Sequence, residues 1–140
     1  MHSAAQLRYE DIVVGAVYEF ERTITNEMVM QFAKFTGDFN PLHTDPFFGA
    51  KSQFGNTIVH GMLAASLFST LIGMHCPGRN AVYMRQTLEF RKPMFCDDTV
   101  IVRGSVIAKH DSVHLITMKT EIVKGDEVMV DGEANARVSE

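Results

Sequence analysis

The chain has 140 residues and a formal net charge of -4, with 46% hydrophobic and 21% charged residues. These values describe one globular domain over residues 1–140, and they exclude a disordered chain. No basic patch or membrane-spanning apolar run stands out, so we expect neither a nucleic-acid nor a membrane partner, and we expect a cytoplasmic protein or the mature part of an organelle protein.

The first half of the chain predicts one strand and two helices. Residues 13–24 are rich in β-branched and aromatic residues, which favours a strand. Residues 25–37 carry apolar residues at helical spacing, and Gly37 is a natural terminator. Pro41 bars an immediate return to helix, so the following segment is expected to be a loop. A short helix is expected over residues 45–52, where an Asp cap precedes a proline.

The second half predicts a long helix and four strands. Between Met62 and Met74 the chain is apolar almost all round, which is typical of a buried helix; we place that helix within residues 59–78, where Pro77 and Gly78 end it. Four alternating segments follow, separated by turn signals, and predict strands over residues 80–93, 99–111, 112–125 and 127–138. Sequential strands favour antiparallel pairing, so the predicted fold is α+β, with a curved sheet wrapped around the buried helix.

The segment FTGDFNPLHTDP after the first predicted helix carries the most chemistry. Asp38 and His43 lie five residues apart in it, and a carboxylate and an imidazole can share proton transfer near neutral pH. Asn40 lies between them and would either fix the loop or hold a water molecule. An Asx-type turn with a surface histidine would use the same residues, and the string alone leaves both interpretations open.

The start of the long helix offers a second chemical feature. Gly61 lies there, and the first N–H groups of a helix lack internal partners and carry the positive end of its dipole. An enolate or thioester oxygen could bind such a group, although a glycine required for tight packing is the commoner case. Ser69 lies about two turns further on, where its hydroxyl would bond either to the loop or back to its own helix.

Cofactor motifs are missing from the sequence. The histidines and cysteines do not have zinc-like spacing, so we expect no metal site. The chain also has neither a glycine-rich phosphate loop nor a Gly-x-Ser-x-Gly turn. These observations speak against a nucleotide cofactor and against a serine nucleophile.

The stretch FAKFTGDFNPLHTDPFFGAKSQFGNTIVHGMLAASLFSTLIG resembles the motif region of the MaoC-like, (R)-specific enoyl-CoA hydratases. The pairing of GDFNPLH with VHGM is its most specific part, and a weaker similarity continues through residues 78–100. The resemblance implies a hot-dog fold and the reversible hydration of a trans-2-enoyl-CoA to a (3R)-3-hydroxyacyl-CoA. It further implies an acyl-CoA substrate, no cofactor, and a homodimer or higher oligomer.

The resemblance also assigns roles to individual residues. It implies a catalytic dyad of Asp38 and His43 and a backbone oxyanion contact at Gly61. It also implies a loop asparagine, Asn40, and a supporting serine, Ser69. We add Ile72 as a candidate pocket residue. The alternatives are an acyl-CoA thioesterase and a non-catalytic acyl-CoA-binding module. The helix has no Asp or Glu between residues 62 and 74, which counts against the thioesterase, and a pure binder needs no proton-transfer pair.

Overall fold

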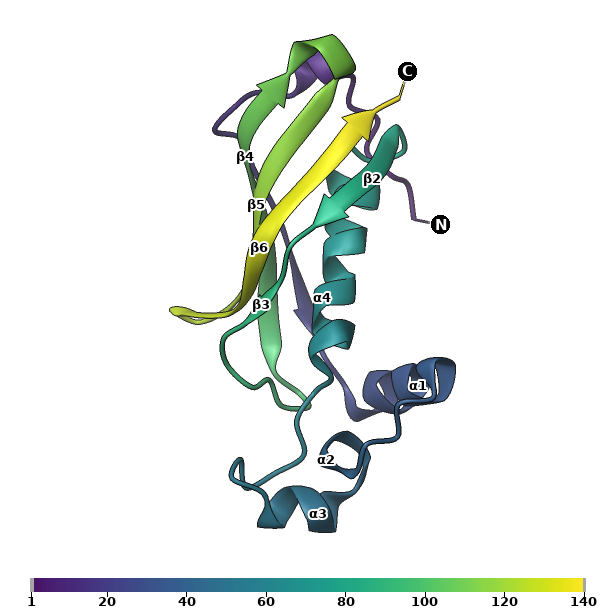
Figure 1. Cartoon of the computed structure of the whole chain (residues 1–140), viewed down its shortest axis with the longest axis vertical. Helices are drawn as coiled ribbons and strands as arrows, with labels where there is room; N and C mark the ends of the chain where they lie inside the picture. The colour runs from purple at the N-terminus through teal and green to yellow at the C-terminus, as the bar shows by residue number, and fades with distance from the viewer. Residues whose placement is uncertain (1, 140) are drawn as a thin grey trace.

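The computed structural model describes residues 2–139 as a curved antiparallel sheet with a helix along one face (Figure 1). The strand order is β1-β4-β5-β6-β2, and β3 pairs with β6. The strands are β1 (Val17–Thr23), β2 (Ala81–Gln86), β3 (Glu89–Phe90), β4 (Thr99–His110), β5 (Leu115–Lys124) and β6 (Glu127–Val138). The helices are α1 (Asn26–Thr36), α2 (Pro41–Thr44), α3 (Pro46–Lys51) and α4 (Gly61–Thr70), with 3₁₀ turns at Tyr9–Asp11 and Asp111–Val113. The predicted α+β fold, a curved sheet around a central helix, is confirmed.

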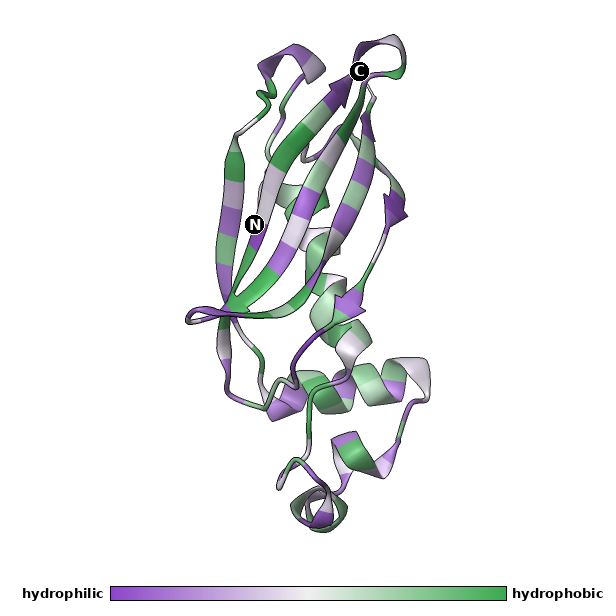
Figure 2. Ribbon diagram, turned by 60° about the vertical axis from the view of Figure 1, so that its left-hand side comes forward, coloured by the Kyte–Doolittle hydropathy of each residue, from purple (hydrophilic) through white to green (hydrophobic). Residues whose placement is uncertain are grey.

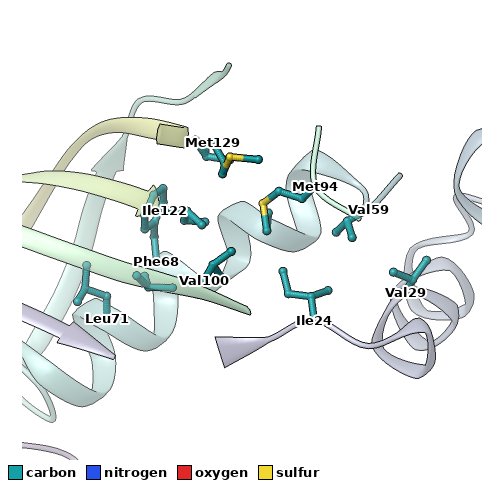
Figure 3. Packing of buried hydrophobic residues seen from close by; sticks show 12 residues of the cluster. Ile24, Val29, Val59, Phe68, Leu71, Met94, Val100, Ile122 and Met129 are labelled. Carbon is teal, nitrogen blue, oxygen red and sulfur yellow. The ribbon is translucent and has the colours of Figure 1, made fainter. Parts of the chain in front are cut away.

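The central helix α4 continues into a π-helical turn at Leu71–His75, so helical structure ends two residues before Pro77, which was predicted with Gly78 to end it. Phe68 is 1% exposed and packs in the cluster that Figure 3 shows, which stabilises the fold by about 1.5–3 kcal/mol. The expectation that the helix is buried all round was wrong, because Ser66 and Ser69 are exposed on one face. Within residues 2–139, no helix combines the length and apolar character needed to cross a membrane.

Strands β4 and β5 supply the sheet side of the core. Their residues alternate between buried and more exposed positions, and Figure 2 shows the matching alternation of hydropathy along the strands. Val100, Val102 and Val106 are the buried set on β4. The pairing of β4 with β5 shifts by one residue between Val106 and Ala108. Because such a bulge increases the local twist, it helps the sheet to curve around α4.

Two predicted strands have different limits in the structure. The predicted strand 13–24 narrows to β1, because the Ala16 N–H donates to the Val13 carbonyl at 3.0 Å and closes a turn. The predicted strand 80–93 divides into β2 and β3 at Thr87. There the Thr87 hydroxyl accepts a hydrogen bond from the Glu133 N–H at 2.9 Å. A side chain therefore replaces a backbone carbonyl in the ladder, and the strand is interrupted.

The connection between β1 and α4 carries three helices below the end of the sheet (Figure 1). The predicted end of α1 is confirmed, because Gly37 adopts a φ of 81° there. The predicted start of α3 is also confirmed, since the Asp45 side chain accepts a hydrogen bond from the Phe47 N–H. Helix α2 was not predicted. Its first residue is Pro41, and a proline is tolerated in that position because its missing N–H would have no helical acceptor.

Candidate active site

Helix α2, the start of α4, the loop that precedes α4 and the segment that follows β3 border a pocket of about 500 Å³. Asp38, His43 and Gly61 line it together, although Gly61 lies 18 residues after His43 in the sequence. The remaining walls are mainly apolar, and they include Phe54, Val59, Ala64, Phe90, Met94 and Val130. A pocket of this size with a few polar groups is suited to a small organic ligand.

Asp38 lies in the exposed loop between α1 and α2. One of its carboxylate oxygens accepts a hydrogen bond from the Asn40 N–H at 3.1 Å. The Asn40 side chain in turn accepts from the Leu42 N–H at 3.0 Å and caps α2. Asn40 therefore fixes the shape of the loop, which was one of its two predicted roles, and it does not line the pocket. The second Asp38 oxygen can serve as a proton acceptor at the surface of the pocket.

His43 lies on α2, and its hydrogen bond determines which ring nitrogen is available. Nδ1 lies 2.8 Å from the Ile58 carbonyl oxygen. A carbonyl can only accept, so the neutral ring carries its proton on Nδ1 and leaves the Nε2 lone pair free. A ring nitrogen of His43 and a carboxylate oxygen of Asp38 lie within 4.8 Å of each other. One water molecule can bridge groups at such a separation.

Gly61 is the first residue of α4, so its N–H has no acceptor within the helix. A Cβ atom at this position would lie 2.8 Å from Cδ1 of Phe90, which also lines the pocket. Glycine thus lets the Phe90 ring lie against the helix terminus. The site combines an open N–H donor, the positive end of a helix dipole and an aromatic wall.

Ser69 and Ile72 are not among the residues that line this pocket. Ser69 is exposed on α4, so the expected need for a buried hydroxyl partner from the Asp38 loop does not arise. Eight residues of helix separate it from Gly61, which corresponds to about 12 Å. Ile72 is 1% exposed and belongs to the core cluster that also contains Ile12 and Cys76.

His60 is the residue of this site that the sequence did not single out for a role. Its side chain is 2% exposed, and its Nε2 lies 3.1 Å from the Asp38 carbonyl oxygen. Its ring stacks on His43, with the ring centroids 4.1 Å apart and 30° between the planes. Its place directly before Gly61 was visible in the sequence, but its contacts depend on chain segments that meet only in the fold.

Asp38, His43 and His60 offer ligand atoms within 4.8 Å of one another, as a metal site would. A metal ion bound to imidazole lies near the ring plane, along the nitrogen lone pair. Because the two imidazole rings are stacked, their lone pairs lie in separate planes and do not converge on one ion. The arrangement fits proton transfer better than metal binding.

Two cations contribute to the pocket wall, and each is paired with a carboxylate. Arg91 Nε lies 2.8 Å from an Asp131 oxygen, and this hydrogen bond raises the pKa of the guanidinium. Lys92 lies 2.8 Å from Glu127, whose pKa it lowers through their hydrogen bond. The pairs are partly exposed, so each adds little to stability, and each cation at the pocket wall is neutralised by its partner.

Comparisons with known proteins identify the family of the chain. The model of the MaoC like domain matches residues 11–128. The chain is 39% identical over 126 residues to the (R)-specific enoyl-CoA hydratase of Aeromonas caviae, covering 89% of this chain and 94% of that protein. It is 38% identical over 132 residues to the 3-hydroxybutyryl-CoA dehydratase of Methylorubrum extorquens, covering 94% and 84%. The unliganded R-hydratase of Pseudomonas aeruginosa superposes with a TM-score of 0.92 at 32% identity, covering 98% and 88%.

Proposed function

Because the chain belongs to the MaoC-like domain family, we propose that it catalyses the reversible hydration of trans-2-enoyl-CoA to (3R)-3-hydroxyacyl-CoA. The observation that carries the proposal is the meeting of Asp38, His43 and the Gly61 N–H in one pocket. Relatives at 38–39% identity are a dehydratase and a hydratase acting on CoA thioesters by name, which are the two directions of one reaction.

Activation of the substrate is assigned to the start of α4. The thioester oxygen would accept a hydrogen bond from the Gly61 N–H, at the positive end of the helix dipole. Polarisation of the carbonyl draws electrons from the conjugated double bond and makes C3 electrophilic. The same contact stabilises the enolate that forms when oxygen adds to C3. No metal or organic cofactor is needed in this scheme, because the thioester itself acidifies C2.

Activation of water is assigned to the dyad. A water molecule has two protons, and two acceptors are available, the Asp38 carboxylate and the His43 Nε2 lone pair. Donation to both would direct the oxygen lone pair away from the dyad, toward C3 of the substrate. Asp38 would take the proton as the principal base, and His43 would orient the water and share the transfer. The dyad then gives the proton that it took from water to C2, so that H and OH of one water molecule are added across the double bond and the enzyme is unchanged.

A homodimer is part of the same proposal. β2 is an edge strand of the sheet, and Val82, Tyr83 and Met84 are exposed on it by 36%, 37% and 58%. An unpaired apolar edge is suited to antiparallel pairing with a second copy. Such pairing would also bring cover to the exposed face of α4 around Ser66. Light scattering on a sizing column should give twice the chain mass, and Met84→Lys should shift the protein toward the monomer.

The reaction is tested by following loss of enoyl absorbance with crotonyl-CoA, together with the configuration of the 3-hydroxyacyl product. We expect turnover to the 3R product without release of free CoA thiol. Thiol release without hydration would favour the thioesterase, and tight binding without turnover would favour the binding module. The supporting role of Ser69 and the acyl-pocket role of Ile72 stay predictions, and substitution of Ile72 should change the ratio of octenoyl-CoA to crotonyl-CoA turnover.

A further inference from the structure

His60 is a buried polar side chain that the mechanism above does not use. It is 2% exposed, and within the described chain its Nδ1 has no hydrogen-bond partner. A buried acceptor without a partner is unfavourable, so a residue that keeps one needs an explanation. A phenylalanine would fill a similar volume without that cost. The contacts of the other ring atoms provide the explanation.

The hydrogen bonds of His60 and His43 fix opposite tautomers in the two stacked rings. His60 donates from Nε2 to the Asp38 carbonyl at 3.1 Å, whereas His43 donates from Nδ1 to the Ile58 carbonyl at 2.8 Å. Both acceptors are carbonyl oxygens, which cannot donate, so the ring nitrogen in each of these hydrogen bonds must carry the proton. The ring of His60 therefore has a fixed orientation, and the face of His43 rests on it with the ring centroids 4.1 Å apart.

The backbone around His60 links the same groups. The two residues before His60 donate backbone hydrogen bonds to two different segments at the pocket. The Ile58 N–H donates to the Leu42 carbonyl at 3.1 Å, and the Val59 N–H donates to the Met94 carbonyl at 2.7 Å. The His60 carbonyl accepts from the Ala64 N–H at 3.2 Å and so begins α4. The next peptide N–H belongs to Gly61. One residue thus contacts Asp38 and His43 with its side chain and sets the position of the oxyanion donor with its backbone.

We propose that His60 is a positioning residue that sets the spacing of the Asp38 carboxylate and the His43 ring above the Gly61 N–H. Its Nε2–H restrains the loop that carries Asp38, and its ring face restrains His43. The inference rests on the proposed hydratase function, since it assigns the dyad its geometry. It predicts that turnover depends on the hydrogen bond that His60 Nε2 donates, and that an aromatic ring of similar volume without this donor does not restore turnover.

Two substitutions separate the donor from the ring. His60→Phe keeps an aromatic ring against His43 but removes the donor to Asp38, whereas His60→Gln places an amide N–H near the position of Nε2 and removes the ring. We expect His60→Phe to lower kcat for crotonyl-CoA by about 100-fold with KM within about threefold, as a displaced dyad would. His60→Gln should recover turnover to within about tenfold of the wild type. The melting temperature of His60→Phe should not fall, because the variant removes an unpaired buried atom.

A matched control is His75→Phe, because His75 is also stacked on an aromatic ring, Phe20, at 4.9 Å but lies outside the pocket. It should turn over like the wild type. Wild-type turnover by His60→Phe, or loss of activity in both His60 variants with a lowered melting temperature, would overturn the proposal. Absence of crotonyl-CoA turnover in the folded wild-type protein would instead overturn the proposed function, so the two failures are distinguishable.

A spectroscopic measurement tests the inference even if a variant does not fold. The ¹⁵N shifts of the imidazole nitrogens in the wild-type protein report which nitrogen carries the proton. We expect the neutral form of His43 to carry its proton on Nδ1 and the neutral form of His60 to carry its proton on Nε2. A spectrum in which His60 carries its proton on Nδ1 would remove the contact with Asp38 and refute the proposed role.

Discussion

Replacing Asp38 with asparagine tests the proposed base with little change in structure. The two side chains have the same shape, and the asparagine Oδ1 can still accept the hydrogen bond that Asp38 accepts from the Asn40 N–H at 3.1 Å. The loop should therefore keep its conformation. What the variant loses is the negative charge and the ability to take a proton from water. Asp38→Asn thus changes the chemistry of the site while it preserves the turn.

The size of the effect follows from the same contacts. A positioned general base contributes about 10²–10⁴-fold to a rate, so we expect kcat to fall by that factor, or by roughly 3–5 kcal/mol in the activation free energy. Asp38 is exposed, and asparagine can make the same side-chain hydrogen bond with the Asn40 N–H, so the free energy of unfolding should change by less than about 0.5 kcal/mol. That corresponds to a melting shift of about 1–2 °C in a chain of this length.

The assay compares hydration of crotonyl-CoA by the wild type, Asp38→Asn and Asp45→Asn at equal concentrations of folded protein. Asp45 is a matched control, because it lies in the same segment and its carboxylate caps α3 by accepting from the Phe47 N–H at 2.9 Å. Asp45→Asn keeps a capping oxygen and should have wild-type turnover. The assignment is refuted if Asp38→Asn stays within about fivefold of the wild type, or if Asp45→Asn loses as much activity.

Other positions give equally direct predictions. Gly61→Ala should lower kcat up to about 100-fold, because the new Cβ would lie 2.8 Å from the Phe90 ring. Adding Phe90→Ala should recover part of the lost turnover, and no recovery would contradict the steric cause. Gly132→Ala would bring a Cβ within 1.8 Å of the Thr87 carbonyl oxygen, so urea unfolding should show a loss of about 3 kcal/mol or more, and an unchanged midpoint would be incompatible with that contact. Partial burial raises the pKa of Tyr9, Tyr18 and Tyr83 above 10, to about 12 for Tyr9 and Tyr83. Absorbance at 295 nm should therefore show that fewer than half of the tyrosines in the native protein are ionised at pH 10, and the free energy of unfolding should decline between pH 10 and 12. Half-ionisation at pH 10 would disprove these shifts.

The sheet and the central helix were predictable because each has one dominant periodicity. β4, β5 and β6 each have one face toward α4, so their sequences alternate, and their limits were predicted to within a few residues. Helix α2 was missed because Pro41 was interpreted only as a helix breaker. The sequence did contain the relevant signal, since an asparagine followed by proline is a capping residue followed by a favourable first helical residue.

Some residues of the candidate site could also be predicted from the sequence, and others could not. Asp38 and His43 were predictable because both lie in one short segment whose composition points to proton transfer. The role of His60 was not, because it depends on two backbone carbonyls, those of Asp38 and Ile58, that meet the two imidazole rings only in the fold. Ser69 was assigned by its distance along the helix, and its exposed position could not be derived from a segment that is apolar nearly all round.

The connection of residues 24–60 between β1 and α4 has a consequence for how this chemistry can arise and change. Asp38, His43 and His60 all belong to it, and it enters and leaves at one end of the sheet (Figure 1). No strand needs a new partner if this connection is lengthened, shortened or exchanged. A sheet-and-helix domain without activity could therefore gain or lose a proton-transfer site through one local insertion, while its core continued to evolve independently.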